Sequence, residues 1–256
     1  SFDLNSLYPH LVMQHNISPE TINQSFKLWP HESQEGRLDK LLDREKINLP
    51  DNHCLAASGY AFTNEFEGVI PRLMRKMYED RKAYKKEMIK DQQEGRDSTY
   101  NNLKQYVMKI LLNSGYGGLT NKFYRWFDQR LGESITLSGQ MMIRTSEKAI
   151  NDWMNNVLKT ENVDYIIAID TDSLYVNFGP LVDKLKPKDV VKTLDTICND
   201  HFTKALNKAY DELATEKNAY VNRMIMEREV IADRGIWTAK KRYILNVHNS
   251  EGVQYA

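Results

Sequence analysis

Hydrophobic runs in the middle of the chain predict two strands that frame its most acidic turn. Residues 163–169 are mostly apolar and include three isoleucines, which predicts a buried strand, and residues 174–178 predict a second strand. A short polar segment separates the two runs, so we expect a hairpin with Asp170 and Asp172 at its tip.

Most other segments also follow a helical or strand periodicity. Residues 31–58 are the exception, because they are charged and irregular, and they predict a peripheral loop region with a short helix at 38–44. The predicted helices cover residues 9–14, 72–90, 99–114, 138–158 and 189–217, and further strands cover 60–66, 123–127, 224–232 and 236–247, the last two joined by a turn at 233–235. This order predicts an α+β fold with a mixed, largely antiparallel sheet backed by helices.

The helix predicted at residues 72–90 carries eight basic and three acidic residues. Its apolar stripe consists of Leu73, Met77, Tyr84 and Met88. Arg81 and Lys85 lie one turn apart along the edge of that stripe. A basic run is usually a solvated face. The edge position also allows the two cations to bind an anion.

The helix predicted at residues 99–114 follows a polar turn, so we expect the two helices to pack antiparallel. Its predicted packing face consists of Leu103, Val107, Ile110 and Leu111. A different face carries Tyr106, Lys109, Asn113 and Tyr116, which recur at spacings of three, four and three. Without other information, Lys109 is an ordinary surface lysine and Tyr116 lies at the edge of the core.

Asp170 and Asp172 place two carboxylates one residue apart at the end of an apolar strand. Such carboxylates repel each other and are costly to desolvate unless a cation neutralises them. Ligands that offer only oxygen favour a hard ion such as Mg²⁺. The alternative is an ordinary polar turn, because Asp-Thr-Asp-Ser also has good turn chemistry.

Composition narrows the class of protein. A chain of 256 residues can bury a substantial core, and no apolar run approaches the roughly 18 to 20 residues that cross a bilayer. No signal peptide is indicated, and Cys54 and Cys198 lack partners at zinc spacing, so we expect reduced thiols in a cytoplasm. The 35 basic and 35 acidic residues balance, so any contact with nucleic acid requires local segregation of charge.

Four motifs occur in a fixed order along the chain. D-x-x-S-L-Y-P begins at Asp3, K-x-x-x-N-S-x-Y-G at Lys109, D-T-D-S at Asp170 and K-K-R-Y at Lys240. In this order and spacing they resemble the palm and fingers of family B DNA polymerases. The opening continues as N-I-S-P-E-T-I at residues 16–22, which makes the chain most similar to the replicative enzymes of large tailed bacteriophages. The resemblance runs from Asp3 to about residue 253.

The resemblance implies template-directed DNA synthesis, in which two Mg²⁺ ions assist nucleotidyl transfer from a deoxynucleoside triphosphate to a primer 3′ hydroxyl. It implies Asp3 and Asp172 as the bridging metal ligands and Asp170 as a weaker member of the site. The Leu4 carbonyl is expected to supply a further oxygen. Glu229 is expected to be a peripheral acid.

The resemblance also assigns substrate contacts. Tyr8 is expected to stack under the incoming sugar and exclude a ribose 2′ hydroxyl, although a core tyrosine is the alternative. Gly117 is expected to contact DNA and to let the chain leave the second helix, and Lys241 and Tyr243 to contact the primer strand. The implied nucleotide-binding set is Ser6, Leu7, Tyr8, Arg81, Lys85, Lys109, Asn113 and Tyr116, whose three cations would converge on the triphosphate.

The implied domains are a palm at residues 1–67 and 118–256 and a fingers subdomain at residues 68–117. The first candidate ligand comes at position 3, so we expect an internal piece of a longer polypeptide that lacks the family's exonuclease and thumb regions. Expected partners are primer-template DNA, deoxynucleoside triphosphates and a sliding clamp that binds outside this chain, with no membrane.

Two positions depart from the family pattern. Ala168-Ile169 stands where Tyr-Gly is common, and the bulkier Ile169 is expected to shift the hairpin or its primer contact. Gly115 replaces a larger apolar residue, which weakens a helix by about 1 kcal/mol relative to Ala.

Two other functions are compatible with part of the sequence. A nucleotidyl cyclase or another two-metal palm enzyme explains Asp3, Asp170 and Asp172 but leaves the motifs at Lys109 and Lys240 unexplained. A polymerase-like subunit that binds DNA without catalysis explains the motif order, but it gives no physical reason to keep like charges buried.

Overall fold

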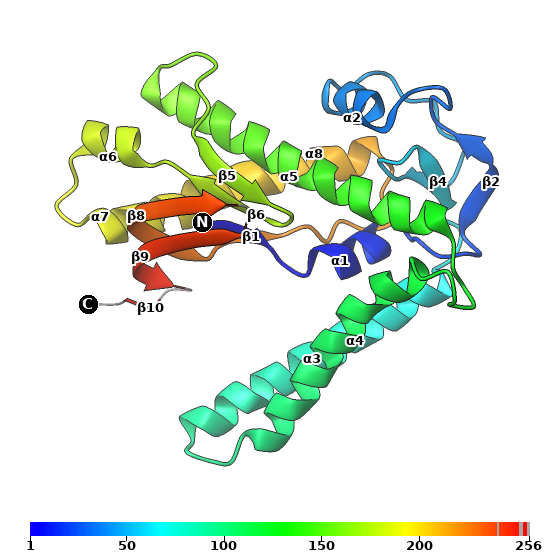
Figure 1. Ribbon diagram of the computed structural model, residues 1–256, viewed down its shortest axis with the longest axis horizontal. Helices are drawn as coiled ribbons and strands as arrows, with labels where there is room; N and C mark the ends of the chain where they lie inside the picture. Colours follow the sequence, from blue (N-terminus) through cyan, green and yellow to red (C-terminus); the bar gives the residue numbers. More distant parts are fainter. Residues whose placement is uncertain (240, 251–252, 255–256) are drawn as a thin grey trace. The chain divides into compact units, whose positions relative to one another are not determined.

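A computed structural model describes residues 1–239, 241–250 and 253–254 (Figure 1). The chain forms two compact units, which we describe separately. The first unit comprises Ser1–Asn5, Gly139–Leu213 and Met224–Ala256, and the second comprises Ser6–Ser138 and Ala214–Arg223. Among the described residues, no helix has both the length and the apolar character needed to cross a membrane.

The first unit contains a four-stranded antiparallel sheet in the order β5-β6-β1-β7. Its strands are β5 (Ile166–Asp170), β6 (Ser173–Val176), β1 (Phe2–Leu4) and β7 (Met226–Arg228). Phe2 and Leu4 are buried on one face of β1, so Asp3 lies on the opposite face. The register places Asp3 opposite Ser173 on β6 and opposite Glu227 on β7. The fold therefore joins the start of the chain to the predicted acidic hairpin.

Helices supply the core of the first unit. Phe2 packs on Phe202, with ring centroids 5.7 Å apart, and Trp153 packs on Phe202 at 4.7 Å. Ser146 and Tyr210 share a buried hydrogen bond of 2.6 Å. The contributing helices are the later part of α5 (Gln129–Leu158), α6 (Gly179–Leu185), α7 (Val190–Ile197), the π-helical turn Cys198–Phe202 and most of α8 (Thr203–Glu216).

Three predictions for the first unit need correction. β5 is an edge strand, so Ile167 is 53% exposed and Ile169 is also exposed rather than buried. The helix predicted over 189–217 follows the right path, but the π-helical turn interrupts it. The last hairpin joins β8 (Val230–Ala239) to β9 (Arg242–Ser250), so the chain turns after Ala239 and not at 233–235. Irregular register within β8 accommodates Asp233 and Arg234 inside the strand.

The second unit begins with α1 (Leu7–Gln14), which starts two residues before its predicted position. Pro9 lies in its first turn, where a missing N–H costs nothing. A three-stranded antiparallel sheet in the order β2-β4-β3 follows in the same unit. Its strands are β2 (Ile22–Lys27), β4 (Tyr60–Thr63) and β3 (His53–Leu55).

Residues 31–58 match the predicted peripheral loop region only in part: residues 43–52 lack helix and strand and none of them is buried, whereas the rest is more ordered. α2 (Gln34–Leu42) begins four residues before the predicted short helix because the Ser33 hydroxyl caps it, accepting from Gly36 N at 3.0 Å. Arg37 is fully buried and donates to the main-chain carbonyls of Leu28, Trp29 and Glu32. Cys54 is also buried, so this region contributes to the core.

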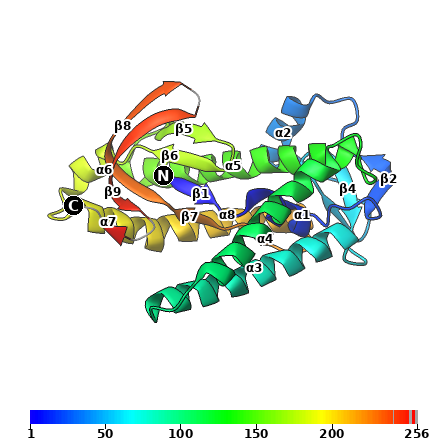
Figure 2. The ribbon, with the colours of Figure 1, turned by 60° about the horizontal axis from the view of Figure 1, so that its bottom comes forward.

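A long helical hairpin forms the middle of the second unit, as the sequence predicts. α3 (Val69–Gln93) and α4 (Thr99–Leu119) lie side by side and antiparallel (Figures 1 and 2). The carboxylate of Asp91 fixes their connection by accepting from Arg96 at 2.6 and 2.9 Å and from Asn101 at 2.7 Å. Because Asp91 is mostly buried, these bonds hold the tip of the hairpin in one geometry.

The packing faces of this hairpin differ from those predicted. Leu103, Val107, Ile110 and Leu111 are all exposed, as is Leu73 on α3. The buried positions are Pro71, Met74 and Asp91 on α3 and Leu112 and Leu119 on α4, while Met77, Tyr84 and Met88 of the predicted stripe are partly buried. Gly115 explains this choice of face, because a Cβ atom there would lie 2.1 Å from Cε of Met74. The glycine lets the end of the Met74 side chain approach α4, and a larger residue would force that side chain to shift.

Two further predictions fail just after this point. α4 continues through Gly117 to Leu119, so Gly117 does not release the chain from the helix. Residues 123–127 form turns rather than a strand. Phe127 N donates to Tyr124 O and Tyr124 N donates to Asn121 O, so local bonds take the place of a strand partner.

Candidate active site

The acidic turn in the first unit has the geometry that its sequence predicts. Asp170 and Ser173 pair at the ends of β5 and β6, and Thr171 and Asp172 form the connection. Thr171 has φ 58°, and Asp172 N donates to Asp170 O at 2.7 Å. A left-handed β-branched residue costs about 1 to 2 kcal/mol, so the fold stores strain at this tip.

Asp3 joins this turn through the sheet. Its neighbour Leu4 donates its main-chain N–H to Asp172 O at 2.8 Å. Burial, followed by the charges of Asp172 and Glu229, raises the pKa of Asp3 from 3.8 to about 7. Burial also raises the pKa of Asp172, and Asp170 adds to this effect, while a main-chain hydrogen bond and Lys241 oppose it. The two carboxylates therefore repel each other in a partly desolvated place.

Asp170 differs from the other two acids because it has a cationic partner. Lys241 Nζ lies 3.7 Å from Asp170 Oδ1. Within the described ranges, neither Asp3 nor Asp172 makes an ion pair, and no three His, Cys, Asp or Glu side chains are grouped closely enough to form a metal site. Two carboxylates without a counter-ion are a donor set that suits a hard divalent cation.

An aromatic cluster lies beside the acids in the same unit. Tyr243 contacts Tyr175 at 5.3 Å and Trp237 at 6.1 Å between ring centroids. Burial and the hydrogen bond with Tyr243 raise the pKa of Tyr175, so its hydroxyl stays protonated. Gly235 makes room for Trp237, since a Cβ there would lie 2.6 Å from the indole ring. Lys240, the first residue of the K-K-R-Y motif, falls outside the described residues.

The second unit brings two predicted nucleotide contacts together. Tyr8 on α1 packs against Tyr116 on α4, with ring centroids 4.7 Å apart and an angle of 39° between the rings. His10 on α1 similarly meets Tyr78 on α3 at 4.6 Å. Ser6 occupies the N-cap position of α1 in a left-handed conformation with φ 48°, and Leu7 is buried. Tyr8 is only partly buried, so it is not the fully buried core tyrosine that was the alternative.

The three predicted cations lie within about one turn of one another along the α3–α4 hairpin. In an antiparallel hairpin, the numbers of facing residues have a nearly constant sum. The sum is 192 for the contact of Asp91 with Asn101 and 189 for that of Met74 with Gly115. Lys109 therefore lies level with residues 80–83 on α3, a range that includes Arg81, and about one turn from Lys85. Arg81 Nε is buried without a hydrogen-bond partner, which leaves one guanidinium donor unsatisfied.

Asn113 and Gly117 lie on the exposed side of α4. No atom lies within 4 Å of the place where a Gly117 Cβ would be. A glycine inside an exposed helix costs about 1 kcal/mol relative to Ala, and packing inside the chain does not explain it. Close approach of a ligand to the helix backbone is a physical reason to keep it.

Residues 122–127, predicted in part as a strand, instead place aromatic side chains on the surface. Phe123 is 87% exposed, and Lys122 Nζ lies 5.1 Å from the centre of its ring. Arg125 similarly lies over Trp126 at 5.8 Å. Exposed rings with adjacent cations suit stacking of single-stranded bases. In the sequence, the alternation of basic and aromatic residues at 122–127 is the pattern from which this exposed aromatic surface could have been predicted.

A second missed residue is Glu227, which the register places opposite Asp3. Glu229, the acid expected from the sequence, contributes to the raised pKa of Asp3. Only the pairing of β1 with β7 reveals the position of Glu227, because 224 residues separate it from Asp3 in the sequence.

The first unit thus carries an acidic hairpin within an antiparallel sheet, and the second unit carries a basic helical hairpin. The model of the family described as DNA polymerase family B matches residues 1–254. The chain therefore belongs to DNA polymerase family B.

Individual relatives agree with this membership. The chain is 29% identical to the DNA-directed DNA polymerase of Escherichia phage RB69 and 30% identical to that of Enterobacteria phage T4. Each alignment covers 100% of this chain and 35% of the relative. DNA polymerase 1 of Pyrococcus abyssi is 26% identical over 96% of this chain and 25% of the relative. The chain thus spans about a third of the length of the two phage relatives.

Proposed function

We propose that this chain is the catalytic core of a DNA-directed DNA polymerase. In this proposal residues 1–67 and 118–256 are the palm and residues 68–117 are the fingers. The observation that carries the proposal is the pair Asp3 and Asp172, which the sheet brings together without a cationic partner among the described residues. The membership of the chain in DNA polymerase family B and the names of its phage relatives support the same activity.

Asp3 and Asp172, with the Leu4 carbonyl, would hold two Mg²⁺ ions. When bound, such ions lower the pKa of a primer 3′ hydroxyl and neutralise charge on the leaving pyrophosphate. Asp3 must ionise to act as a ligand, and a cation beside it favours that form. Asp170 takes a lesser part, because Lys241 already neutralises it.

The α3–α4 hairpin would bind the incoming deoxynucleoside triphosphate. Arg81 offers a planar set of donors to phosphate oxygens, while Lys85 and Lys109 act as point charges. Tyr8 would stack under the sugar and exclude a ribose 2′ hydroxyl, and the adjoining Ser6 and Leu7 would border the triphosphate. On α4, Asn113 and Tyr116 would border the nascent base pair, and Gly117 would contact DNA.

Primer-template DNA is the proposed macromolecular partner. Lys241 is two-thirds exposed, and Tyr243 presents a partly exposed ring, so both are accessible to a primer backbone. The charge that binds DNA is local, because the chain as a whole is neutral. A sliding clamp is proposed as a further partner that binds outside these residues.

Primer extension tests the proposal directly. The polypeptide that contains this sequence should extend a primed template with Mg²⁺ and all four deoxynucleotides, and Asp172→Ala should abolish extension while preserving DNA binding. Asp183→Asn, at an exposed position of α6 in the same unit, is the matched control and should extend normally. Unchanged extension by Asp172→Ala would refute the metal assignment. Synthesis without a template would favour another nucleotidyl transferase or a cyclase.

A further inference from the structure

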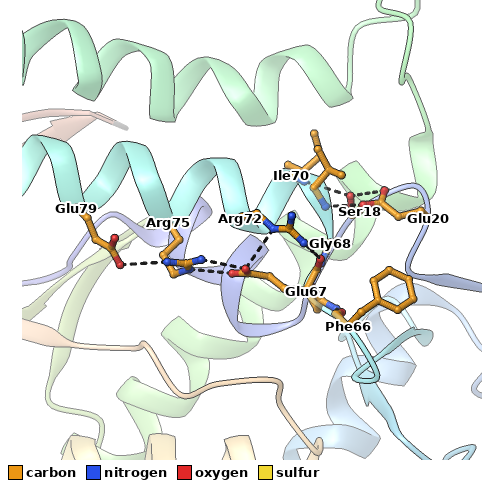
Figure 3. Close-up of polar contacts among 11 residues, drawn as sticks. Ser18, Glu20, Phe66, Glu67, Gly68, Ile70, Arg72, Arg75 and Glu79 are labelled. Carbon is orange, nitrogen blue, oxygen red and sulfur yellow. Dashed lines mark hydrogen bonds and ion pairs between the residues drawn. The ribbon is translucent and has the colours of Figure 1, made fainter.

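The N-terminus of α3 is capped by a segment far away in the sequence. Gly68 is the N-cap residue and has no side chain to satisfy the first N–H groups of the helix. Residues that follow α1 supply the acceptors instead: the Asn16 amide oxygen accepts from Gly68 N at 2.9 Å, and a Glu20 carboxylate oxygen accepts from Val69 N. The Ser18 hydroxyl lies 3.4 Å from Ile70 N, within hydrogen-bond reach (Figure 3).

Asn16 joins three elements with one buried side chain. It follows α1 in a left-handed conformation with φ 51° and closes the C-terminus of that helix. Its amide nitrogen donates to the carbonyls of Thr63 and Phe66, each at 2.8 Å. The side-chain hydrogen bonds of Asn16, together with its place after α1, thus hold the end of α1, the end of β4 and the start of α3 at fixed positions.

Glu20 brings negative charge to the positive end of a 25-residue helix. Desolvation opposes its ionisation, but hydrogen bonds from Ser18 and from Val69 N, and the charge of Arg72, lower the pKa of Glu20 below its usual value. Gly68 is required for this approach, because a Cβ there would lie 2.7 Å from the Ser18 Cβ. The contact is therefore specific in both charge and shape.

Glu67, two residues before the start of α3, also holds this end of the helix. Its carboxylate accepts two bonds from Arg75, at 2.9 and 3.0 Å, and lies 3.6 Å from Arg72 (Figure 3). Arg75 also reaches Glu79, one turn further along. The first turns of α3 are thus fixed by directional charged hydrogen bonds.

The direction of α3 decides where its cations lie. Arg81 comes 12 residues after Val69, or roughly 18 Å along the helix axis. A tilt of about 10° at the cap would move Arg81 by about 3 Å, which exceeds the tolerance for orienting a bound substrate. Further along, α1 meets the hairpin through ring contacts, His10 with Tyr78 and Tyr8 with Tyr116, which are less directional than hydrogen bonds.

We propose that Asn16, Ser18 and Glu20 are positioning residues for nucleotide binding. They cap α3 from the end of α1, and so they fix Arg81 relative to Tyr8, which α1 itself carries. This inference rests on the proposed function, in which Arg81 and Tyr8 contact the incoming nucleotide.

The test compares nucleotide affinity with DNA affinity in single-turnover incorporation. Glu20→Ala should raise the apparent Kd for the deoxynucleotide about tenfold, the scale of losing a charged helix cap. The Kd for primer-template should stay within about twofold. Glu20→Gln should recover most of the loss, because its amide oxygen still accepts from Val69 N. Glu35→Ala removes an acid from the first turn of α2, which Ser33 caps, and should change nothing.

Gly68→Ala should disturb the same cap, because its Cβ would collide with the Ser18 Cβ. It should therefore weaken nucleotide binding but not DNA binding. A lower melting temperature with unchanged nucleotide Kd in both Glu20→Ala and Gly68→Ala would show a merely structural cap and overturn the inference. Arg81→Ala separates this failure from failure of the proposed function. If Arg81→Ala weakens nucleotide binding while the cap variants do not, only the positioning role is wrong; if Arg81→Ala has no effect either, both proposals fail.

Discussion

Replacing Asp3 by Asn should stabilise the metal-free protein while destroying its proposed activity. Asn has nearly the same shape as Asp but removes a charge that lies beside Asp172 and Glu229. The pKa of Asp3 rises from 3.8 to about 7, a shift that would correspond to about 4 kcal/mol for a fully buried group. Asp3 is only partly buried, so solvent screening reduces the expected gain to about 1 to 2 kcal/mol.

The gain should depend on pH in a definite direction. The pKa of Asp3 is higher in the folded state than in the unfolded state, so the folded state binds more protons between pH 3.8 and about 7. The wild-type protein therefore loses stability as the pH rises through this window, whereas the Asp3→Asn protein does not lose this contribution. The difference should be largest at pH 8 and should disappear near pH 4.

Urea unfolding in the presence of a chelator, at pH 8 and at pH 5, measures this difference as a shift in the midpoint. Asp183→Asn, on the exposed side of α6, is the matched control and should show no comparable shift. A loss of stability in Asp3→Asn at pH 8, or an equal gain at both pH values, would refute the electrostatic account of this site.

Three other predictions concern the α3–α4 hairpin. Lys109→Ala should weaken deoxynucleotide binding about tenfold and leave DNA binding nearly unchanged, so equal losses in titrations of both ligands would contradict a triphosphate role. Gly117→Ala should raise the unfolding free energy by up to about 1 kcal/mol, because its Cβ would meet no atom within 4 Å, yet slow single-nucleotide incorporation; unchanged incorporation would show that no ligand approaches there. Gly115→Ala should destabilise the wild-type protein but stabilise a Met74→Ala background, and a double-mutant cycle in denaturant that finds no coupling would disprove their contact.

Sequence periodicity predicted where most helices and strands occur. It predicted less well which face of each element is buried and which is exposed. On α4, apolar residues occur nearly all around the helix, so the pattern could not select Leu112 over Leu111 as the buried position. Gly115 contributes to the selection, because its missing side chain admits the end of Met74 from the other helix. The prediction that Ile167 and Ile169 are buried was wrong for a related reason. An apolar strand at the edge of a sheet has the same composition as a buried one.

The candidate site was more predictable where a motif carried the chemistry. The acids at Asp170 and Asp172 occupy a hairpin tip as expected, and β1 brings Asp3 beside it. Pairing across more than 200 residues could not be derived from the sequence, so Glu227 was missed. The cap formed by Asn16 and Glu20 was equally hidden, because it satisfies main-chain groups about 50 residues away.

Binding of a divalent cation tests the central claim most directly. Titration of Mn²⁺, followed by electron paramagnetic resonance, should show binding by the wild-type polypeptide that weakens at least about tenfold in both Asp3→Asn and Asp172→Asn. Asp183→Asn should bind like the wild type. Full affinity in both substituted proteins would show that Asp3 and Asp172 do not hold the ions, and it would contradict the proposed two-metal site.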